Sequence, residues 1–444
     1  MNEQINAFYL KSKEYTEIAN DLYRKFDVKK GLRNEDGTGV RVGLTKIADV
    51  IGYKIVEDVK KDANGELFYR GIELRDIIQG RNYDTICGYE ETCFLLLFGY
   101  LPKQDELTTF STYLKNHYEL PEDFLETKFL TMPGKNLMNR LQQAVLALYD
   151  YDDAPDNISI ENTLEQGLNI LAKLPSIICY AYQSKLHRYS KKSLVIHQVQ
   201  SNLSIAENIL YMLRKDHSFT KLEAQVLDMM LIVHADHGGG NNSTFTNVVI
   251  SSTGTDIYSS IVGAIGSMKG PRHGGANLKV SGMMKAVIEE IGYCENDVEI
   301  KALIYRIMHK QFYDYAGLVY GMGHAIYTLS DPRSEVLQAY IERLAQKKGM
   351  EKEYQFYQRF EQCAKEVIYD VKGVHIASNV DFYSGFVYGM MGIPEDLYTP
   401  LFVMARTIGW LAHNIENKAF DGRIVRPATK YVGTSSKYKT MEER

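Results

Sequence analysis

The stretch HADHGGGNN, residues 234–242, combines histidine, aspartate, glycine and asparagine in one short segment. Three kinds of site use such a mixture: a metal site, a phosphate-binding loop, or one part of an acid–base site that other parts of the chain complete. The stretch by itself is compatible with all three, so the rest of the sequence must distinguish between them.

A metal site in this stretch would rest on His234, Asp236 and His237. Zinc needs three or four ligands, but the sequence has no HExxH motif and no cysteine near these residues. We therefore expect no metal and keep a metal-dependent hydrolase built on these three residues only as a distant alternative. A phosphate loop is also disfavoured, because neither GxGxxG after a strand nor GxxxxGK[ST] is present.

An acid–base site uses more of the sequence, because three further glycine-rich or turn-like breaks carry ionisable side chains. They are GPRHGGAN with His273, GMGHAIYTLSDPR with His324, and NVDFYSG with Asp381. His273 precedes a predicted helix, whose N-terminal dipole disfavours the charged imidazolium. A neutral imidazole can donate a hydrogen bond to a carbonyl oxygen that is becoming an enolate.

Asp381 is the candidate base of this site. A carboxylate with an ordinary pKa of about 4 can remove a proton from carbon only if the developing oxyanion is stabilised at the same moment. Asp381 and a neutral histidine are therefore needed together. Two histidines and one aspartate suit carbon–carbon bond formation between two carbonyl compounds.

Three arginines could bind the carboxylates of a substrate. Arg406 interrupts an apolar segment, Arg333 follows the third glycine-rich break, and Arg426 lies in the tail GRIVRPATKYVG. An arginine in apolar surroundings should be paired with an anion. The alternative for each is a structural salt bridge with aspartate or glutamate. The remaining histidines are expected to be structural: His117, His187, His197, His217, His309, His375 and His413.

Composition excludes several classes of protein. The chain has 444 residues, 45% of them hydrophobic, and a net charge of −5, which favours a folded protein without general attraction to nucleic acid or anionic membranes. The five cysteines form no CxxC pair, and the N-terminal residues lack the apolar core of a signal peptide. We expect reduced thiols, no membrane span and a cytoplasmic location.

The hydrophobic pattern predicts a mainly helical chain with a small strand region. Short alternating runs over residues 39–71 predict strands, with a turn at residues 62–65. Helices are predicted where apolar residues recur at helical spacing or where caps mark the ends. The clearest are residues 221–233, residues 276–291, a helix from Asp331-Pro332 to near Gly349, and a buried helix after Pro394.

Several blocks of this sequence resemble the successive signatures of the citrate synthase family. They are HADHGGGNNSTFT, SSIVGAIGSMKGPRHGGAN, GMGHAIYTLSDPR and NVDFYSGFVYGMMGIPEDLYTPLFVMARTIGWLAHNIE, with GLRNEDGTGVRVGLTKIADVIGY and LFYRGIELRDII nearer the N-terminus. The resemblance runs from about residue 30 to about residue 433. It implies a mainly α, multi-helical fold with minor β structure near the N-terminus. A large domain of residues 1–275 and 391–444 would hold an inserted small domain of residues 276–390.

The resemblance also implies roles for the acid–base residues. His273 would hold and protonate the thioester oxygen of acetyl-CoA, Asp381 would remove a methyl proton, and His324 would polarise the ketone of oxaloacetate. His237 would bind oxaloacetate by a hydrogen bond. No cofactor is implied, because acetyl-CoA is a substrate.

Further roles follow from the same resemblance. Arg333, Arg406 and Arg426 would bind carboxylates, with Arg426 reaching the site of a second subunit in a homodimer. The loop formed by Gly321, Met322 and Gly323 would face CoA.

Two positions depart from the pattern of many bacterial members, which carry basic residues there. Ala325 follows the GMGH histidine and Ala428 follows the RP of the tail, so contacts to the phosphates of CoA are not assigned. The nearest alternative activity is that of 2-methylcitrate synthase, which uses propionyl-CoA with the same residues. The two acyl groups differ by one methylene, worth about 1–3 kcal/mol of discrimination.

Overall fold

The structure is a computed structural model that describes residues 11–12, 18–34, 38–57, 59–81, 87–420 and 422–443. The chain divides into two compact units, Thr45–Arg423 and a smaller unit that combines Met1–Leu44 with Ile424–Arg444. The smaller unit contains the short helix α2 (Asp21–Lys25) and the 3-10 turns η1 (Lys30–Leu32) and η5 (Met441–Glu443). Every predicted site residue except Arg426 belongs to the larger unit.

The larger unit begins with a three-stranded antiparallel sheet, which confirms the predicted strand region. Its strands, in the order β1-β2-β3, are β1 (Ala48–Val56), β2 (Val59–Tyr69) and β3 (Ile72–Glu73). The turn predicted at residues 62–65 is wrong, because Val56 pairs with Val59 and the chain reverses between them.

Residues 62–65 form a bulge in β2 instead of a turn. The register shifts here, since Ile51 pairs with Glu66 but Tyr53 pairs with Asp62. The bulge turns backbone groups towards a distant segment: the Ala63 and Gly65 N–H groups donate to the hydroxyls of Thr328 and Ser330. A side chain at Gly65 would collide with that segment, because a Cβ would lie 2.2 Å from the Ser330 carbonyl oxygen.

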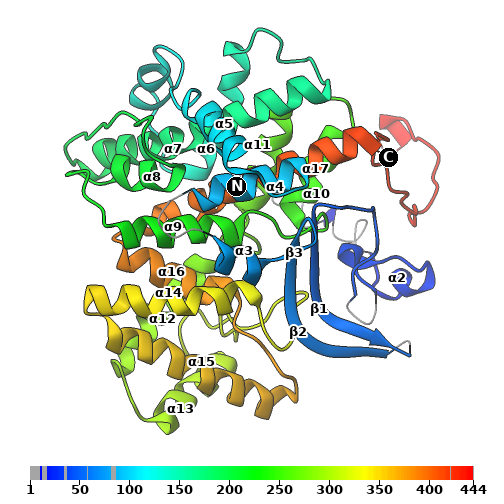
Figure 1. Cartoon of the computed structure of the whole chain (residues 1–444). Helices are drawn as coiled ribbons and strands as arrows, with labels where there is room; N and C mark the ends of the chain where they lie inside the picture. The colour runs from blue at the N-terminus through cyan, green and yellow to red at the C-terminus, as the bar shows by residue number, and fades with distance from the viewer. Residues whose placement is uncertain are drawn as a thin grey trace. The chain divides into compact units, whose positions relative to one another are not determined.

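Most helices of one group in the larger unit contact α17, the helix after Pro394 (Figure 1). Sixteen of the seventeen positions from Tyr398 to Asn414 are buried, with Phe402 as the exception, which confirms the predicted buried segment. The members are α3 (Leu74–Gly80), α4 (Gly88–Phe98), α5 (Gln104–Lys115), α6 (Leu137–Ala147), α7 (Ile160–Ser190), α8 (Ile205–Leu213), α9 (Lys221–His234), α10 (Asn242–Ser251), α11 (Ile257–Met268) and α17 (Tyr398–Phe420).

A second group of helices, α12–α16, pairs mainly within itself and lies below α9 in Figure 1. Its members are α12 (Ala276–Ile291), α13 (Asp297–Met308), α14 (Pro332–Lys348), α15 (Glu351–Lys372) and α16 (Val380–Met390). Helix α14 also contacts α9, α3 and β2, so the two groups are joined. The assignment of residues 276–390 to an inserted domain stays a prediction.

Local signals predicted the ends of these helices well. Asp331 caps α14 by accepting from the Arg333 N–H (3.0 Å), and Gly349 ends the helix with φ of 66°. Helix α12 spans the predicted residues 276–291. Short turns complete the larger unit: η2 (Glu126–Leu130), η3 (Leu148–Tyr151) and η4 (Glu395–Leu397).

The predicted mainly helical fold class is confirmed. The composition also led us to expect reduced thiols and no membrane span. None of the five cysteines, all of which the structure describes, forms a disulfide. Within the described ranges, no helix combines the length and the apolar character of a membrane span.

Candidate active site

The opening HADHGGGNN stretch connects the end of α9 to the start of α10. His234 is the last residue of α9, and Gly238, with φ of 77°, lets the chain turn directly after His237. The His237 ring is buried, and its Nε2 has no hydrogen-bond partner among the described residues. Burial lowers the pKa of His237 well below its usual value, and the nearby charges of Arg333 and Arg406 lower it further. His237 is therefore a neutral group able to bind a polar ligand.

Asp236 holds this stretch against α17. Its Oδ2 accepts hydrogen bonds from the Gly238 N–H (2.9 Å) and from His413 Nε2 (3.2 Å). Burial opposes ionisation of Asp236, but the charge of His413 and its hydrogen bond outweigh burial and lower the pKa. Gly409 permits the close approach, because a Cβ there would lie 2.4 Å from Asp236 Oδ1.

His324 follows two glycines in left-handed conformations, Gly321 (φ 81°) and Gly323 (φ 95°). Its Nδ1 accepts from the backbone N–H groups of Ile326 (3.1 Å) and Tyr327 (3.2 Å). Nδ1 therefore carries no proton, and in the neutral ring Nε2 is the donor. The His324 ring centroid lies 5.0 Å from that of His237. The structure thus brings together two histidines that are far apart in the sequence.

His273 lies in the turn before α12, as predicted. Its Nε2 is 2.9 Å from the hydroxyl oxygen of Ser243, near the start of α10. Burial, with a smaller contribution from the charge of Arg406, lowers the pKa of His273 to about 4. The neutral state was predicted from the helix dipole, but burial is the first cause in the structure and Arg406 the second.

Asp381 lies in the first turn of α16, where the side chain of Asn379 caps the helix by accepting from the Asp381 N–H (3.0 Å). The Asp381 residue is partly buried. Desolvation raises the pKa of its carboxyl to about 6, although the positive charges of Arg333 and Arg406 oppose the rise. Asp381 is thus a stronger base than an ordinary aspartate and is still mostly ionised at neutral pH.

The two arginines of this unit have different partners. Arg333 is buried and binds Asp331 through Nε (3.0 Å) and Nη2 (2.7 Å), so the salt bridge considered as its alternative is present. Arg406 is 0% exposed and donates from Nε to the His234 carbonyl (2.7 Å). Neither Nη1 nor Nη2 of Arg406 has a hydrogen-bond partner among the described residues.

The segments that carry His237, His273, His324 and Asp381 are close enough for their charges to affect one another. The pKa of His237 responds, after burial, to Arg333, His324, Arg406 and His273. The pKa of Asp381 responds to Arg333 and Arg406 as well. Four glycine-flanked breaks and α17 therefore contribute to a common cluster. Arg426 is exposed and belongs to the smaller unit, so its role stays a prediction.

The loop predicted to face CoA is held against α16. The Gly323 N–H donates to the Ala377 carbonyl (2.7 Å), and Met322 forms a β-bridge with Ser378. A Cβ at Gly321 would lie 2.9 Å from Phe382. Packing against the start of α16 thus explains the glycine at position 321, and the contact of Gly321, Met322 and Gly323 with CoA stays a prediction.

Three residues of the cluster were missed by reasoning from the sequence. Tyr327 stacks on His324 (4.7 Å between centroids), and its ring lies 5.5 Å from the guanidinium carbon of Arg333. Phe402 lies 4.6 Å from His234 and 4.9 Å from the Arg406 guanidinium. Trp410 donates to Ser243 (3.1 Å). The spacing of Phe402, Arg406 and Trp410, four residues apart on one helix face, was the available signal.

A metal site does not assemble from the opening stretch. The carboxylate of Asp236 is directed to His413, and no group of three or more potential metal ligands is found among the described residues.

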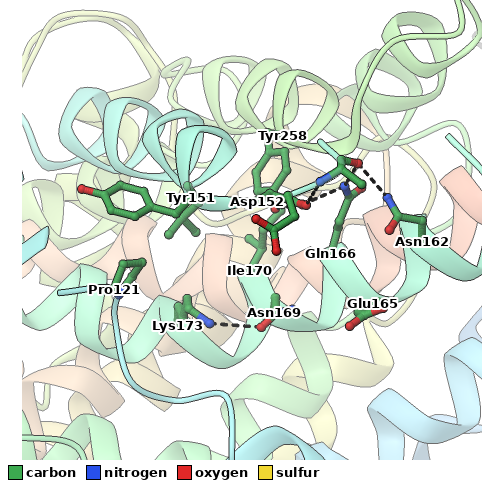
Figure 2. A pocket seen from close by; sticks show the side chains of 13 residues that line it. Pro121, Tyr151, Asp152, Asn162, Glu165, Gln166, Asn169, Ile170, Lys173 and Tyr258 are labelled. Atoms are coloured by element: carbon green, nitrogen blue, oxygen red, sulfur yellow. Dashed lines mark hydrogen bonds between the residues drawn. The ribbon is translucent and has the colours of Figure 1, made fainter. Parts of the chain in front are cut away.

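A separate cavity of about 330 Å³ lies beside α7 (Figure 2). Its polar walls are largely paired: Asp152 accepts from Gln166 (2.8 Å) and Tyr258 (2.7 Å), and Lys173 donates to Asn169 (3.0 Å). None of the predicted site residues lines this cavity.

Comparison with known proteins agrees with the resemblance seen in the sequence. A family model described as "Citrate synthase, C-terminal domain" matches residues 36–428. The chain is 35% identical over 411 residues to citrate synthase from Haloferax volcanii, covering 92% of this chain and 96% of that protein. It is 32% identical over 370 residues to 2-methylcitrate synthase from Shewanella oneidensis, covering 83% and 89%.

Solved structures show the same similarity. A ternary complex of citrate synthase from Thermoplasma acidophilum with carboxymethyl coenzyme A and oxaloacetate has a TM-score of 0.74 at 26% identity, covering 94% of this chain and 99% of that one. The structure of citrate synthase from Pyrobaculum aerophilum has a TM-score of 0.73 at 28% identity, covering 91% and 94%.

Proposed function

This chain belongs to the citrate synthase family, and from that premise we propose that it condenses acetyl-CoA with oxaloacetate and hydrolyses citryl-CoA to citrate and CoA. The observation that carries the proposal is the buried cluster in which Arg406 has two unpartnered Nη groups beside neutral histidines and a basic carboxylate. A buried guanidinium with two unpartnered Nη groups favours a carboxylate ligand.

Asp381 and His273 would carry the first step. Asp381 removes a proton from the methyl group of acetyl-CoA while His273, hydrogen-bonded to the thioester oxygen, transfers its proton to that oxygen. The raised pKa of Asp381 and the neutral state of His273 suit these roles, because the base is strengthened and the acid does not protonate the substrate prematurely. The product of this step is an enol.

His324 and His237 would carry the second step. The methyl carbon of the enol attacks the ketone carbon of oxaloacetate and forms the new carbon–carbon bond, while the ketone oxygen receives a proton. His324 is suited to supply it, because its Nδ1 is occupied by backbone N–H groups and Nε2 is left as the donor. Water then cleaves the thioester of citryl-CoA and releases CoA and citrate.

Arg406, Arg333 and His237 would bind oxaloacetate. Arg426, exposed in the C-terminal segment, would reach the site of a second subunit, so we propose a homodimer. The backbone of Gly321–Gly323 would contact CoA, whereas Ala325 and Ala428 supply no charge for its phosphates. No metal or bound cofactor is required by this scheme. A cytoplasmic location agrees with the absence of disulfides among the described cysteines.

The test is an assay of CoA release from acetyl-CoA, with and without oxaloacetate. We expect release that depends on oxaloacetate and that falls about 10²- to 10⁴-fold in Asp381→Ala, the range for loss of a general base. Asp297→Ala is a matched control, since Asp297 also lies in the first turn of a helix but is exposed. Undiminished release by Asp381→Ala would refute the mechanism.

A comparison of substrates separates this activity from its nearest alternative. A relative from Shewanella oneidensis is named 2-methylcitrate synthase, so propionyl-CoA is the competitor. We expect a higher kcat/KM for acetyl-CoA. A clear preference for propionyl-CoA would reassign the substrate but not the mechanism.

A further inference from the structure

Trp410 is a buried aromatic residue on α17 that touches the acid–base cluster through a single hydrogen bond. Its indole Nε1–H donates to the hydroxyl oxygen of Ser243 at 3.1 Å, and the same oxygen lies 2.9 Å from His273 Nε2. We propose that Trp410 is a positioning residue that acts through Ser243 to fix which nitrogen of His273 carries the proton.

The hydroxyl of Ser243 has one hydrogen and two lone pairs. An indole N–H can only donate, so Trp410 occupies one lone pair permanently. The other neighbours of the oxygen are His273 Nε2 and the side-chain carbonyl of Asn241, which accepts at 2.9 Å. The single hydrogen of Ser243 can therefore point to Asn241 or to His273, but not to both.

These two arrangements give His273 opposite tautomers. If the hydrogen points to Asn241, His273 must donate from Nε2, and its Nδ1 is a bare acceptor. If the hydrogen points to His273, Nε2 accepts and Nδ1 carries the proton. Only the second arrangement lets His273 donate from Nδ1 to a carbonyl oxygen.

Trp410 favours the second arrangement. An oxygen that already accepts one N–H becomes a stronger donor and a poorer acceptor for a second N–H, because hydrogen bonds in series polarise one another. Asn241 is only partly buried and can exchange its bond for water. Trp410 is 0% exposed and cannot turn away.

The effect of the His273 tautomer on turnover rests on the proposed function, but the tautomer itself can be tested independently of that function. If His273 stabilises an enolate oxygen, an Nδ1–H tautomer is needed for each turnover. The location of the proton, however, can be measured in the resting protein, whichever reaction it catalyses.

The experiment uses the fact that Trp410 is the only tryptophan in the sequence. Replacing it with benzothienylalanine, in which sulfur takes the place of the indole N–H, removes the donor and keeps the ring shape. ¹⁵N NMR of histidine-labelled protein then reports which nitrogen of His273 is protonated, with the signal assigned by its loss in His273→Gln. Ser243→Ala with native tryptophan and with the analogue completes a double-mutant cycle.

In native protein we expect His273 to carry its proton on Nδ1, and the analogue should shift population to the Nε2–H form. Turnover kcat should fall about tenfold, the factor for one hydrogen bond of ordinary strength, while KM for oxaloacetate stays within about twofold. In Ser243→Ala the analogue should cost nothing further. An unchanged proton position, or an equal loss in Ser243→Ala, would overturn the proposal. Absence of CoA release by native protein would instead refute the proposed function and leave the NMR result standing.

Discussion

Arg333 at the start of α14 and Arg406 in the middle of α17 are both buried, yet their surroundings are opposite. Burial lowers the pKa of Arg333, but its two-pronged ion pair with Asp331 outweighs burial and leaves the pKa raised. Among the described residues, the His234 carbonyl is the one hydrogen-bond partner of the Arg406 side chain, and burial lowers the pKa of Arg406 to about 10. The guanidinium of Arg333 is paired with a carboxylate, whereas no carboxylate among the described residues forms a hydrogen bond with Arg406.

This difference suggests different functions for the two arginines: one holds the helices of the site together, and the other is available to bind a ligand. Asp331 accepts from the backbone N–H of Val380 (3.3 Å) as well as from Arg333, so this ion pair joins the start of α14 to the start of α16, next to Asp381. Arg406 leaves two donors, Nη1 and Nη2, that form no hydrogen bond with any described residue. We infer that Arg333 mainly arranges the site and that Arg406 mainly binds the substrate.

The largest expected effect on substrate binding comes from Arg406→Gln. The change removes the charge that a substrate carboxylate would meet, and loss of one partner of a buried charged pair costs roughly 2–5 kcal/mol. KM for oxaloacetate should therefore rise about 100-fold, as measured by steady-state kinetics. The free energy of unfolding without substrate should stay the same or increase, because an uncompensated buried charge is removed.

The control for this variant is Arg359→Gln, which removes an exposed arginine on α15. Its KM for oxaloacetate should match that of the native protein. If Arg406→Gln destabilised the substrate-free protein as strongly as it weakened binding, Arg406 would be a structural residue and the contrast with Arg333 would fail.

The next effect is on stability and comes from Arg333→Met. The buried carboxylate of Asp331 would lose its counter-charge, and breaking a buried ion pair in this way costs roughly 3–5 kcal/mol. Urea unfolding of the substrate-free protein measures the loss. Adding Asp331→Asn to Arg333→Met should restore part of the stability, since the orphaned charge is then gone. A normal unfolding midpoint for Arg333→Met would show that the ion pair does not organise the site.

The sequence predicted those features that short-range signals specify. Helix α14 begins at an aspartate–proline pair and ends at a glycine, and both signals act within a few residues. The turn at residues 62–65 was misplaced because its glycine and asparagine serve a bulge whose partners, Thr328 and Ser330, are distant in sequence. No local pattern reveals such a contact.

In the site, too, residues marked by short-range signals could be predicted, and contacts between distant segments could not. His237, His273, His324 and Asp381 were recognisable because each follows or precedes residues that turn the backbone sharply. The pairing of Arg333 with Asp331 was open to prediction, since the two are only two residues apart. The hydrogen bond from Trp410 to Ser243 was not, because it depends on how α17 packs against α10.

The smallest effect concerns pH and tests whether Arg406 shares the site of Asp381. The base must be ionised, and burial raises the pKa of Asp381 to about 6, so kcat/KM should fall as pH drops through about 6, by tenfold per unit below it. His273, with a pKa lowered to about 4, should add no step in this range. The charge of Arg406 opposes the rise in the pKa of Asp381.

Removing that charge should therefore move the acid limb of kcat/KM to higher pH in Arg406→Gln. The exposed control Arg359→Gln should leave the limb in place. A limb that stayed fixed in Arg406→Gln would mean that the two side chains do not interact electrostatically. Because the shift needs only the electrostatic field of Arg406, it separates proximity to Asp381 from direct contact with oxaloacetate, which the change in KM reports.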